Sequence, residues 1–124
     1  MADASLLETF ANPHPGRDYL IVHIAREFTS LCPVTSQPDF ARIAVRYVAG
    51  DSCIELRSLK RYLQSYRNDG VYYEDATNKI LNDLVACCQP RWMELESKWS
   101  IRGGIRSTIV VHHGDRGVAP RQGP

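Results

Sequence analysis

A cysteine and an aspartate seven residues apart are the side chains in this sequence best suited to covalent chemistry. Cys32 and Asp39 lie in the segment FTSLCPVTSQPDFA (28–41), in which two prolines restrict the backbone. A thiolate is a strong nucleophile, and a carboxyl group with a pKa raised by burial can donate a proton in the same step. The residues alone leave two interpretations open: this chemistry, or a structural cysteine and an aspartate that caps a turn.

The other potential metal ligands are spaced in ways that do not favour a metal site. Cys87 and Cys88 are adjacent in a predicted helix, and His112 and His113 are adjacent in a predicted strand, so that the members of each pair point in different directions. Cys53 begins a short extended segment, where packing in the core is the simpler role. We therefore expect no metal ion. The four cysteines could form two disulfides, but without a secretory signal the reducing cytosol favours free thiols.

Cationic residues gather at two places that can hold an anion. One is the junction before a predicted helix, and the other is a turn with two glycines. The residues are Arg57, Lys60 and Arg61 beside Glu55, and Arg102 beside Gly103 and Gly104. Backbone N–H groups and the dipole at a helix start favour phosphate, although a solvated helix face is the alternative. The sequence has neither a GxGxxG motif after a strand nor a P-loop, so any nucleotide would need a different site.

Two helices and two pairs of strands must position these residues. Apolar residues at i, i+3, i+4 and i+7 predict a helix from an N-cap at Ser58 to Asn68–Gly70, and a second helix at about 74–88 that Pro90 ends. Glu74 opens the second helix, where it can cap the helix or accept hydrogen bonds from a guanine-like edge. Alternation and β-branched residues predict strands at 19–27, 40–50, 92–99 and 105–111.

The element order β-β-α-α-β-β predicts an α+β fold, an antiparallel sheet with two helices on one face. Such a sheet has two exposed edges, which favour pairing with other copies of the chain. We expect one domain at 18–113, between a Pro- and Asn-containing tail at 1–17 and a Gly/Pro/Arg-rich tail at 114–124. Sites in such a protein can fall between subunits.

Composition and charge narrow the functional classes. Hydrophobic residues make up 44% and charged residues 23% of the 124 residues, as in soluble globular proteins, and the formal net charge is +1. This balance gives no general attraction to nucleic acid or to membranes. The first residues form neither a signal peptide nor a membrane-spanning segment, which predicts a cytoplasmic protein.

Read together, these motifs resemble the NADPH-dependent 7-cyano-7-deazaguanine reductase family in its single-module form. The resemblance covers about residues 19–112 and rests on four features: CPVTSQPDFA (32–41), ELRSLKRYLQSYRNDG (55–70), Glu74, and IRGGI (101–105). The Glu-Leu-x-Ser-Leu-Lys motif is the signature of the members that use NADPH. The resemblance implies the tunnelling fold (T-fold), whose β-β-α-α-β-β units assemble into rings with active sites between subunits, here a decamer of two stacked pentamers.

The resemblance also implies a reaction and a set of site residues. Cys32 would add to the nitrile of 7-cyano-7-deazaguanine to form a thioimide, Asp39 would donate the proton, and two hydrides from NADPH would give 7-aminomethyl-7-deazaguanine for queuosine biosynthesis. The substrate would lie against Ile54, Glu55, Leu56, Tyr73 and Glu74, and the cofactor against Leu56, Arg57, Arg102 and Gly103. No stable binding of nucleic acid, no membrane and no metal would be involved.

Two positions depart from the family pattern. Tyr73 stands where the family usually has histidine, and a phenol does not hold a positive charge near neutrality. Arg57 stands where the signature usually has lysine, and its guanidinium differs in reach. Two other functions remain alternatives: an amidinotransferase that acts on the same base in tRNA, and a purine- or pterin-binding protein without catalysis. A relative of GTP cyclohydrolase would need clustered zinc ligands, which the sequence does not show.

Overall fold

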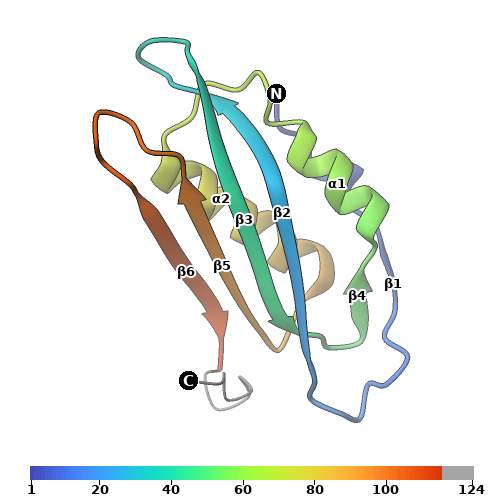
Figure 1. Cartoon of the computed structure of the whole chain (residues 1–124). Helices are drawn as coiled ribbons and strands as arrows, with labels where there is room; N and C mark the ends of the chain where they lie inside the picture. The colour runs from blue at the N-terminus through green and yellow to red at the C-terminus, as the bar shows by residue number, and fades with distance from the viewer. Residues whose placement is uncertain (116–124) are drawn as a thin grey trace.

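The computed structural model describes residues 1–115 (Figure 1). In chain order the elements are the 3-10 helix η1 (Ala4–Leu6) and the strands and helices β1 (Thr9–Ala11), β2 (Leu20–Leu31), β3 (Pro38–Val48), β4 (Ser52–Ile54), α1 (Leu56–Gln64), α2 (Tyr73–Cys88), β5 (Trp92–Trp99) and β6 (Thr108–Gly114).

The main sheet has the strand order β2-β3-β5-β6, and every neighbouring pair is antiparallel. Strand β3 has one apolar face that packs into the core. The residues of this face alternate along the strand and are all buried: Ala41, Ile43, Val45 and Tyr47. Figure 1 shows α1 and α2 on the same face of this sheet. The expected α+β fold, with two helices over an antiparallel sheet, is confirmed.

The two helices bury the apolar faces that their sequence spacing predicts. In α1 the buried apolar residues are Leu59, Tyr62 and Leu63, and in α2 they include Ile80, Leu81 and Leu84. Positions three and four apart lie on one side of a helix, so each helix presents one apolar stripe to the sheet. The core therefore lies between the helices and the sheet, and it fixes the two layers relative to each other.

The segment 1–17 differs from the expected tail. It contains η1 and β1, and β1 pairs with β4 so that Phe10 lies opposite Cys53. Strand β4 has no partner in the main sheet, so its backbone groups take the nearest extended segment as their hydrogen-bonding partner. The expected tail at 114–124 begins within β6, and residues 116–124 lie outside the described residues.

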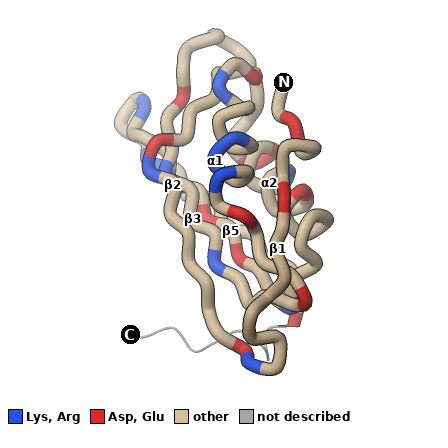
Figure 2. Tube along the Cα trace, turned by 90° about the vertical axis from the view of Figure 1, so that its right-hand side faces the viewer, with Lys and Arg blue, Asp and Glu red and all other residues tan. Residues whose placement is uncertain are grey.

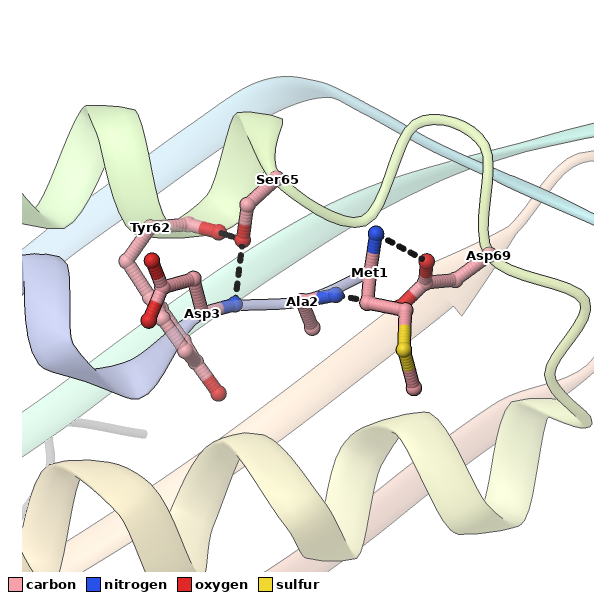
Figure 3. A network of polar contacts seen from close by, with 6 residues as sticks. All are labelled: Met1, Ala2, Asp3, Tyr62, Ser65 and Asp69. Atoms are coloured by element: carbon pink, nitrogen blue, oxygen red, sulfur yellow. Dashed lines mark hydrogen bonds and ion pairs between the residues drawn. The ribbon is translucent and has the colours of Figure 1, made fainter.

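The first residues also bind the connection between α1 and α2 (Figure 3). The Asp69 carboxylate accepts a hydrogen bond from the backbone N–H of Ala2 at 2.5 Å and lies 3.2 Å from the Met1 ammonium group. The N–H of Asp3 donates to the Ser65 hydroxyl at 3.0 Å. The connection is thus fixed on its outer side by residues that are distant in sequence.

Several predicted boundaries were wrong for local reasons. Helix α1 begins at Leu56, because the Glu55 carboxylate and not Ser58 caps it, and it ends at Gln64, where turns follow. Strand β2 continues to Leu31 and β3 begins at Pro38, which leaves only six residues, 32–37, as a loop. Strand β6 begins three residues later than expected, because residues 102–105 close a separate tight turn.

Candidate active site

Cys32 is the first residue after β2 and opens the turn that leads to β3. Its N–H donates to the carbonyl of Gln37 at 2.8 Å, and its carbonyl accepts from the N–H of Ser36 at 2.9 Å. Ser36 has φ +62°, a left-handed conformation that lets the chain reverse within a few residues. The turn is thus closed by backbone hydrogen bonds on both sides of Cys32, which holds the thiol in a defined place.

The Cys32 thiol is partly exposed, and its environment favours the thiolate. The hydroxyl of Thr35 lowers the pKa of this thiol, and the N–H groups of Thr35 and Val34 lower it further by hydrogen bonding to the sulfur. Desolvation and the nearby charge of Asp39 oppose this effect but do not outweigh it. In contrast, burial raises the pKa of the Cys87 thiol. Cys32 therefore has the environment of a nucleophile.

Asp39 is the second residue of β3, and only 3% of it is exposed. Its Oδ1 atom accepts hydrogen bonds from the Arg102 guanidinium, which also forms an ion pair with it, and from the Tyr73 hydroxyl at 3.4 Å. Among residues 1–115, no protein donor is bonded to Oδ2. One oxygen of Asp39 is therefore held by the protein, while the other has no donor in residues 1–115.

Arg102 reaches Asp39 from a two-residue hairpin turn. Arg102 and Ile105 exchange two backbone hydrogen bonds, each 3.0 Å long, around Gly103 and Gly104. Both glycines have positive φ, +58° and +78°, as a type I′ turn requires. Hydrogen bonding to Asp39 raises the pKa of Arg102, so the guanidinium keeps its charge in this contact.

Tyr73 and Glu74 open α2 beside the Cys32 turn. The connection from α1 pairs with the end of β2: the N–H of Leu31 donates to the Asp69 carbonyl at 2.8 Å, and the N–H of Val71 donates to the Leu31 carbonyl at 3.1 Å. Burial and the charge of Asp39 raise the pKa of Tyr73, so its hydroxyl stays a neutral donor. Glu74 is exposed in the first turn of α2 and is available to a ligand.

The remaining predicted site residues lie elsewhere in the protomer. Ile54 is buried at the end of β4, whereas Leu56, 57% exposed, opens α1. The Glu55 carboxylate accepts hydrogen bonds from the N–H groups of Arg57, at 2.7 Å, and Ser58, at 2.9 Å, which lower its pKa. Figure 1 shows this start of α1 far along the sheet from the loop after β2. One protomer thus brings together Cys32, Asp39, Tyr73, Glu74 and Arg102, but not the group 54–57.

One hollow runs along α1, and another lies at its start. A cavity of about 390 Å³ separates α1 from the edge strand β2, and Leu56, Leu59 and Lys60 are among its lining residues. A second hollow of about 400 Å³ is lined by Glu8, Glu55, Arg57, Ser58 and Arg61. Figure 2 shows basic residues on the outer side of α1. The guanidinium groups of Arg57 and Arg61 are of the kind that binds phosphate, whereas the N–H groups of Arg57 and Ser58 in the first helical turn already donate to the Glu55 carboxylate.

We call the region around Cys32, Asp39, Tyr73 and Arg102 the reactive end. Three further residues of this region were missed by sequence reasoning. Thr35 is hydrogen-bonded to Cys32, and its position three residues after a cysteine that is followed by proline could have indicated a turn that folds back on the thiol. Trp99 stacks on Tyr73 with ring centroids 3.9 Å apart. Ser30 lies opposite Asp39 in the β2–β3 pairing, and its buried hydroxyl has no hydrogen-bond partner among residues 1–115. The last two depend on tertiary contacts, for which no local signal exists.

Other kinds of site are not evident in the described part of the chain. No group of three or more His, Cys, Asp or Glu side chains within residues 1–115 is arranged to hold a metal ion. All four cysteines are free. No helix in this range is long and apolar enough to cross a membrane.

Comparison with known proteins gives a consistent set of relatives. The chain is 50% identical over 110 residues to a protein of Anaeromyxobacter sp. (strain K), which covers 89% of this chain and 90% of that protein. It is 52% identical to proteins of Rhodopirellula baltica, over 88% of this chain and 90% of that protein, and of Chlorobaculum tepidum, over 87% and 92%. All three are named NADPH-dependent 7-cyano-7-deazaguanine reductase.

Structural comparison supports the same fold. The crystal structure of the archaeosine synthase QueF-Like in the apo form matches with a TM-score of 0.73, at 21% identity, over 77% of this chain and 94% of that chain. The family described as QueF-like protein matches residues 38–118. With most of its length matched at about half identity, this chain belongs to the QueF-like protein family.

Proposed function

We propose that this chain reduces the nitrile of 7-cyano-7-deazaguanine to the amine of 7-aminomethyl-7-deazaguanine, with NADPH as reductant, in queuosine biosynthesis. The observation that carries the proposal is the pairing of a thiol with a lowered pKa, Cys32, and a nearby buried carboxylate, Asp39, that has one oxygen without a donor in the described part of the chain. The relatives at about 50% identity are named for this reaction.

In this proposal Cys32 and Asp39 act in one addition step. The Cys32 sulfur forms a bond to the nitrile carbon, and the nitrogen takes a proton, so that a C≡N bond becomes the C=N bond of a thioimide. A nitrile is a modest electrophile, whereas the thioimide carbon accepts hydride more readily. That proton comes from the Cys32 thiol and would pass to the nitrogen by way of Oδ2 of Asp39, since Arg102 and Tyr73 hold Oδ1. When the C–S bond later breaks, Cys32 is regenerated and the imine remains for the second reduction.

The residues at the two ends of the site fit the phosphates and the ring of NADPH. Arg57 and Arg61 line the hollow at the start of α1, and no carboxylate within residues 1–115 forms an ion pair with either of them. No atom lies within 4 Å of where a Cβ would stand on Gly103, so a flat ring can approach the backbone there. When bound, NADPH supplies the two hydrides. Arg102, Gly103, Leu56 and Arg57 would hold it.

We further propose that the complete site forms between two subunits. Cys32, Asp39, Tyr73 and Glu74 would come from one protomer, and Ile54, Glu55 and Leu56 from another. The support is the separation of these two groups within the protomer, together with the two open edges of the sheet at β2 and β6. The assembly would be a T-fold ring of single-module subunits, stacked in pairs to give a decamer, with Glu74 binding the amino and ring N–H groups of the base.

One experiment tests the function. Purified protein is incubated with 7-cyano-7-deazaguanine, and the NADPH absorbance and the intact mass of the protein are followed together. We expect NADPH oxidation and an adduct that is absent in Cys32→Ala. An adduct without NADPH oxidation would favour the amidinotransferase instead, and an absence of both adduct and turnover would favour a binding protein without catalysis.

A second experiment tests the shared site. Differently tagged Cys32→Ala and Arg57→Glu subunits are co-expressed, and assemblies that carry both tags are isolated. If each site takes Cys32 from one subunit and Arg57 from its neighbour, random mixing restores about one quarter of the wild-type sites. Activity no greater than the sum of the two parent variants would show that each site lies within one subunit.

A further inference from the structure

Trp99 is the last residue of β5, and only 2% of it is exposed. Its ring is stacked on Tyr73, with centroids 3.9 Å apart and planes within 9° of parallel. Phe28 meets Trp99 edge-on, with centroids 5.9 Å apart and planes at 88°. Trp99 therefore contacts both Tyr73 and Phe28, and the Tyr73 hydroxyl donates a hydrogen bond to Asp39.

A chain of buried hydrogen bonds fixes both rings. The indole N–H of Trp99 donates to Ser97 Oγ at 2.9 Å, Ser97 and Thr77 are hydrogen-bonded at 2.7 Å, and Thr77 Oγ1 donates to the Tyr73 carbonyl at 2.7 Å. Because the one proton of Thr77 goes to Tyr73, Ser97 must donate to Thr77. The chain starts at the Trp99 ring and ends on the backbone of Tyr73, so the two stacked residues are tied together twice.

This arrangement leaves the Tyr73 side chain little freedom. Its backbone is fixed by Thr77, its ring by Trp99, and its hydroxyl by Asp39. Burial and the charge of Asp39 raise the pKa of Tyr73, so it donates a hydrogen bond rather than losing its proton. Tyr73 and Arg102 both donate to Oδ1, and Oδ2 has no protein donor within residues 1–115.

We propose that Trp99, with Ser97 and Thr77, is a positioning residue that aims the Tyr73 hydroxyl at Asp39 and so orients Asp39 for proton transfer. The inference rests on the proposed function, in which the Asp39 proton passes to the nitrile nitrogen while sulfur bonds to carbon. Tyr73 and Trp99 neither gain nor lose a covalent bond. Their hydrogen bond and stacking geometry would determine how fast the addition occurs.

The test measures the addition step alone. Protein is mixed with 7-cyano-7-deazaguanine in the absence of NADPH, and the rate of Cys32 adduct formation is followed by intact mass for Trp99→Leu, Tyr73→Phe and the double variant. We expect each single change to slow the addition by about tenfold, because an error in position of about 1 Å can cost about 100-fold. The double variant should lie within about twofold of Tyr73→Phe, since Trp99 acts through Tyr73.

Matched controls separate positioning from packing. Trp92, 6% exposed at the other end of β5, is the comparison residue, and Trp92→Leu should leave the addition rate unchanged. Trp99→Phe keeps an aromatic face for Tyr73 and should restore most of the rate lost in Trp99→Leu. Alkylation of Cys32 by iodoacetamide needs no proton donor, so its rate should be unchanged in all variants.

Three results would overturn the inference: rate losses that multiply to about 100-fold in the double variant, an equal loss in Trp92→Leu, or no recovery in Trp99→Phe. If Trp99→Leu does not fold, Trp99→Phe and Ser97→Ala carry the same comparison, and Ser97→Ala should show no further loss in the Tyr73→Phe background. A wild-type protein that forms no adduct would overturn the proposed function and this inference together, whereas adduct formation with multiplicative losses would overturn the inference alone.

Discussion

The two ends of the predicted site are built in different ways. At the reactive end, the carboxylate of Asp39 is buried, accepts hydrogen bonds from Tyr73 of α2 and Arg102 of a tight turn, and has one oxygen without a donor among residues 1–115. At the start of α1, the carboxylate of Glu55 bonds to two backbone N–H groups of its own helix. Within the protomer, Glu55 is thus already hydrogen-bonded through both carboxylate oxygens, whereas Asp39 is bonded through one, although the same family resemblance marked both as site residues.

Removal of the proposed nucleophile should have the largest effect on activity. Cys32→Ala should lower nitrile reduction by about 1,000-fold or more and abolish the adduct, because no other group can form the covalent intermediate. Cys87→Ala is the matched control, since burial raises the pKa of that thiol and no predicted role depends on it. The measurements are NADPH oxidation and intact mass. Substantial reduction by Cys32→Ala would remove covalent catalysis from the mechanism.

Substitution of the two predicted cofactor arginines should change different kinetic parameters, because they lie at different ends of the site. Arg57→Ala should raise the KM for NADPH by about tenfold or more, the value of a lost charge-assisted hydrogen bond, and leave adduct formation without NADPH unchanged. Arg102→Ala should slow adduct formation as well, because Arg102 holds Asp39. Single-turnover adduct rates and steady-state kinetics distinguish the two. An effect of Arg57→Ala on adduct formation would show that the two ends are not separable.

The parts of the fold that could be predicted from sequence are those that depend on local periodicity. The alternation in β3 and the apolar stripes of α1 and α2 appear in the order of the residues, because one buried face imposes a period of 2 or 3.6. Caps were less predictable, since Ser58 and Glu55 are both polar residues near the start of α1 and only the backbone geometry selects Glu55. The β1–β4 pairing joins residues 41 to 45 positions apart, which periodicity does not encode.

The candidate site was predicted by residue identity but not by contact. Cys32 and Asp39 stand in one recognisable motif, whereas the ion pair of Asp39 with Arg102 joins residues 63 positions apart. The stacking of Tyr73 on Trp99 is likewise a tertiary contact. Tyr73 stands where the family usually has histidine. Its stacking on Trp99 fixes the orientation of its ring, which the identity of the residue alone does not predict.

Two buried serines offer a test of how the reactive end is built. Ser97 has hydrogen-bond partners in Trp99 and Thr77, whereas the Ser30 hydroxyl has none among residues 1–115, and both residues are fully buried. Ser97→Ala should lower the free energy of unfolding by about 1–3 kcal/mol, because it leaves buried donors and acceptors unpaired. Ser30→Ala should leave stability unchanged or increase it slightly. Denaturant unfolding measures both, and an equal loss for the two variants would show that Ser30 has an unrecognised partner.

The smallest expected effect concerns Glu55 and its dependence on pH. Its hydrogen bonds to the N–H groups of Arg57 and Ser58 hold its pKa below the ordinary value of 4.5, so the cap stabilises the fold above that value and is lost as the pH falls through the lowered pKa. Glu55→Ala should therefore lower the melting temperature by a few degrees at pH 7, and the difference from wild type should shrink in acid. Thermal unfolding followed by circular dichroism across this pH range measures both. The rate of Cys32 alkylation in this variant is the control that the turn at Cys32 is intact. A pH-independent loss of stability would mean that the carboxylate charge is not what caps α1, and the contrast with Asp39 would then fail.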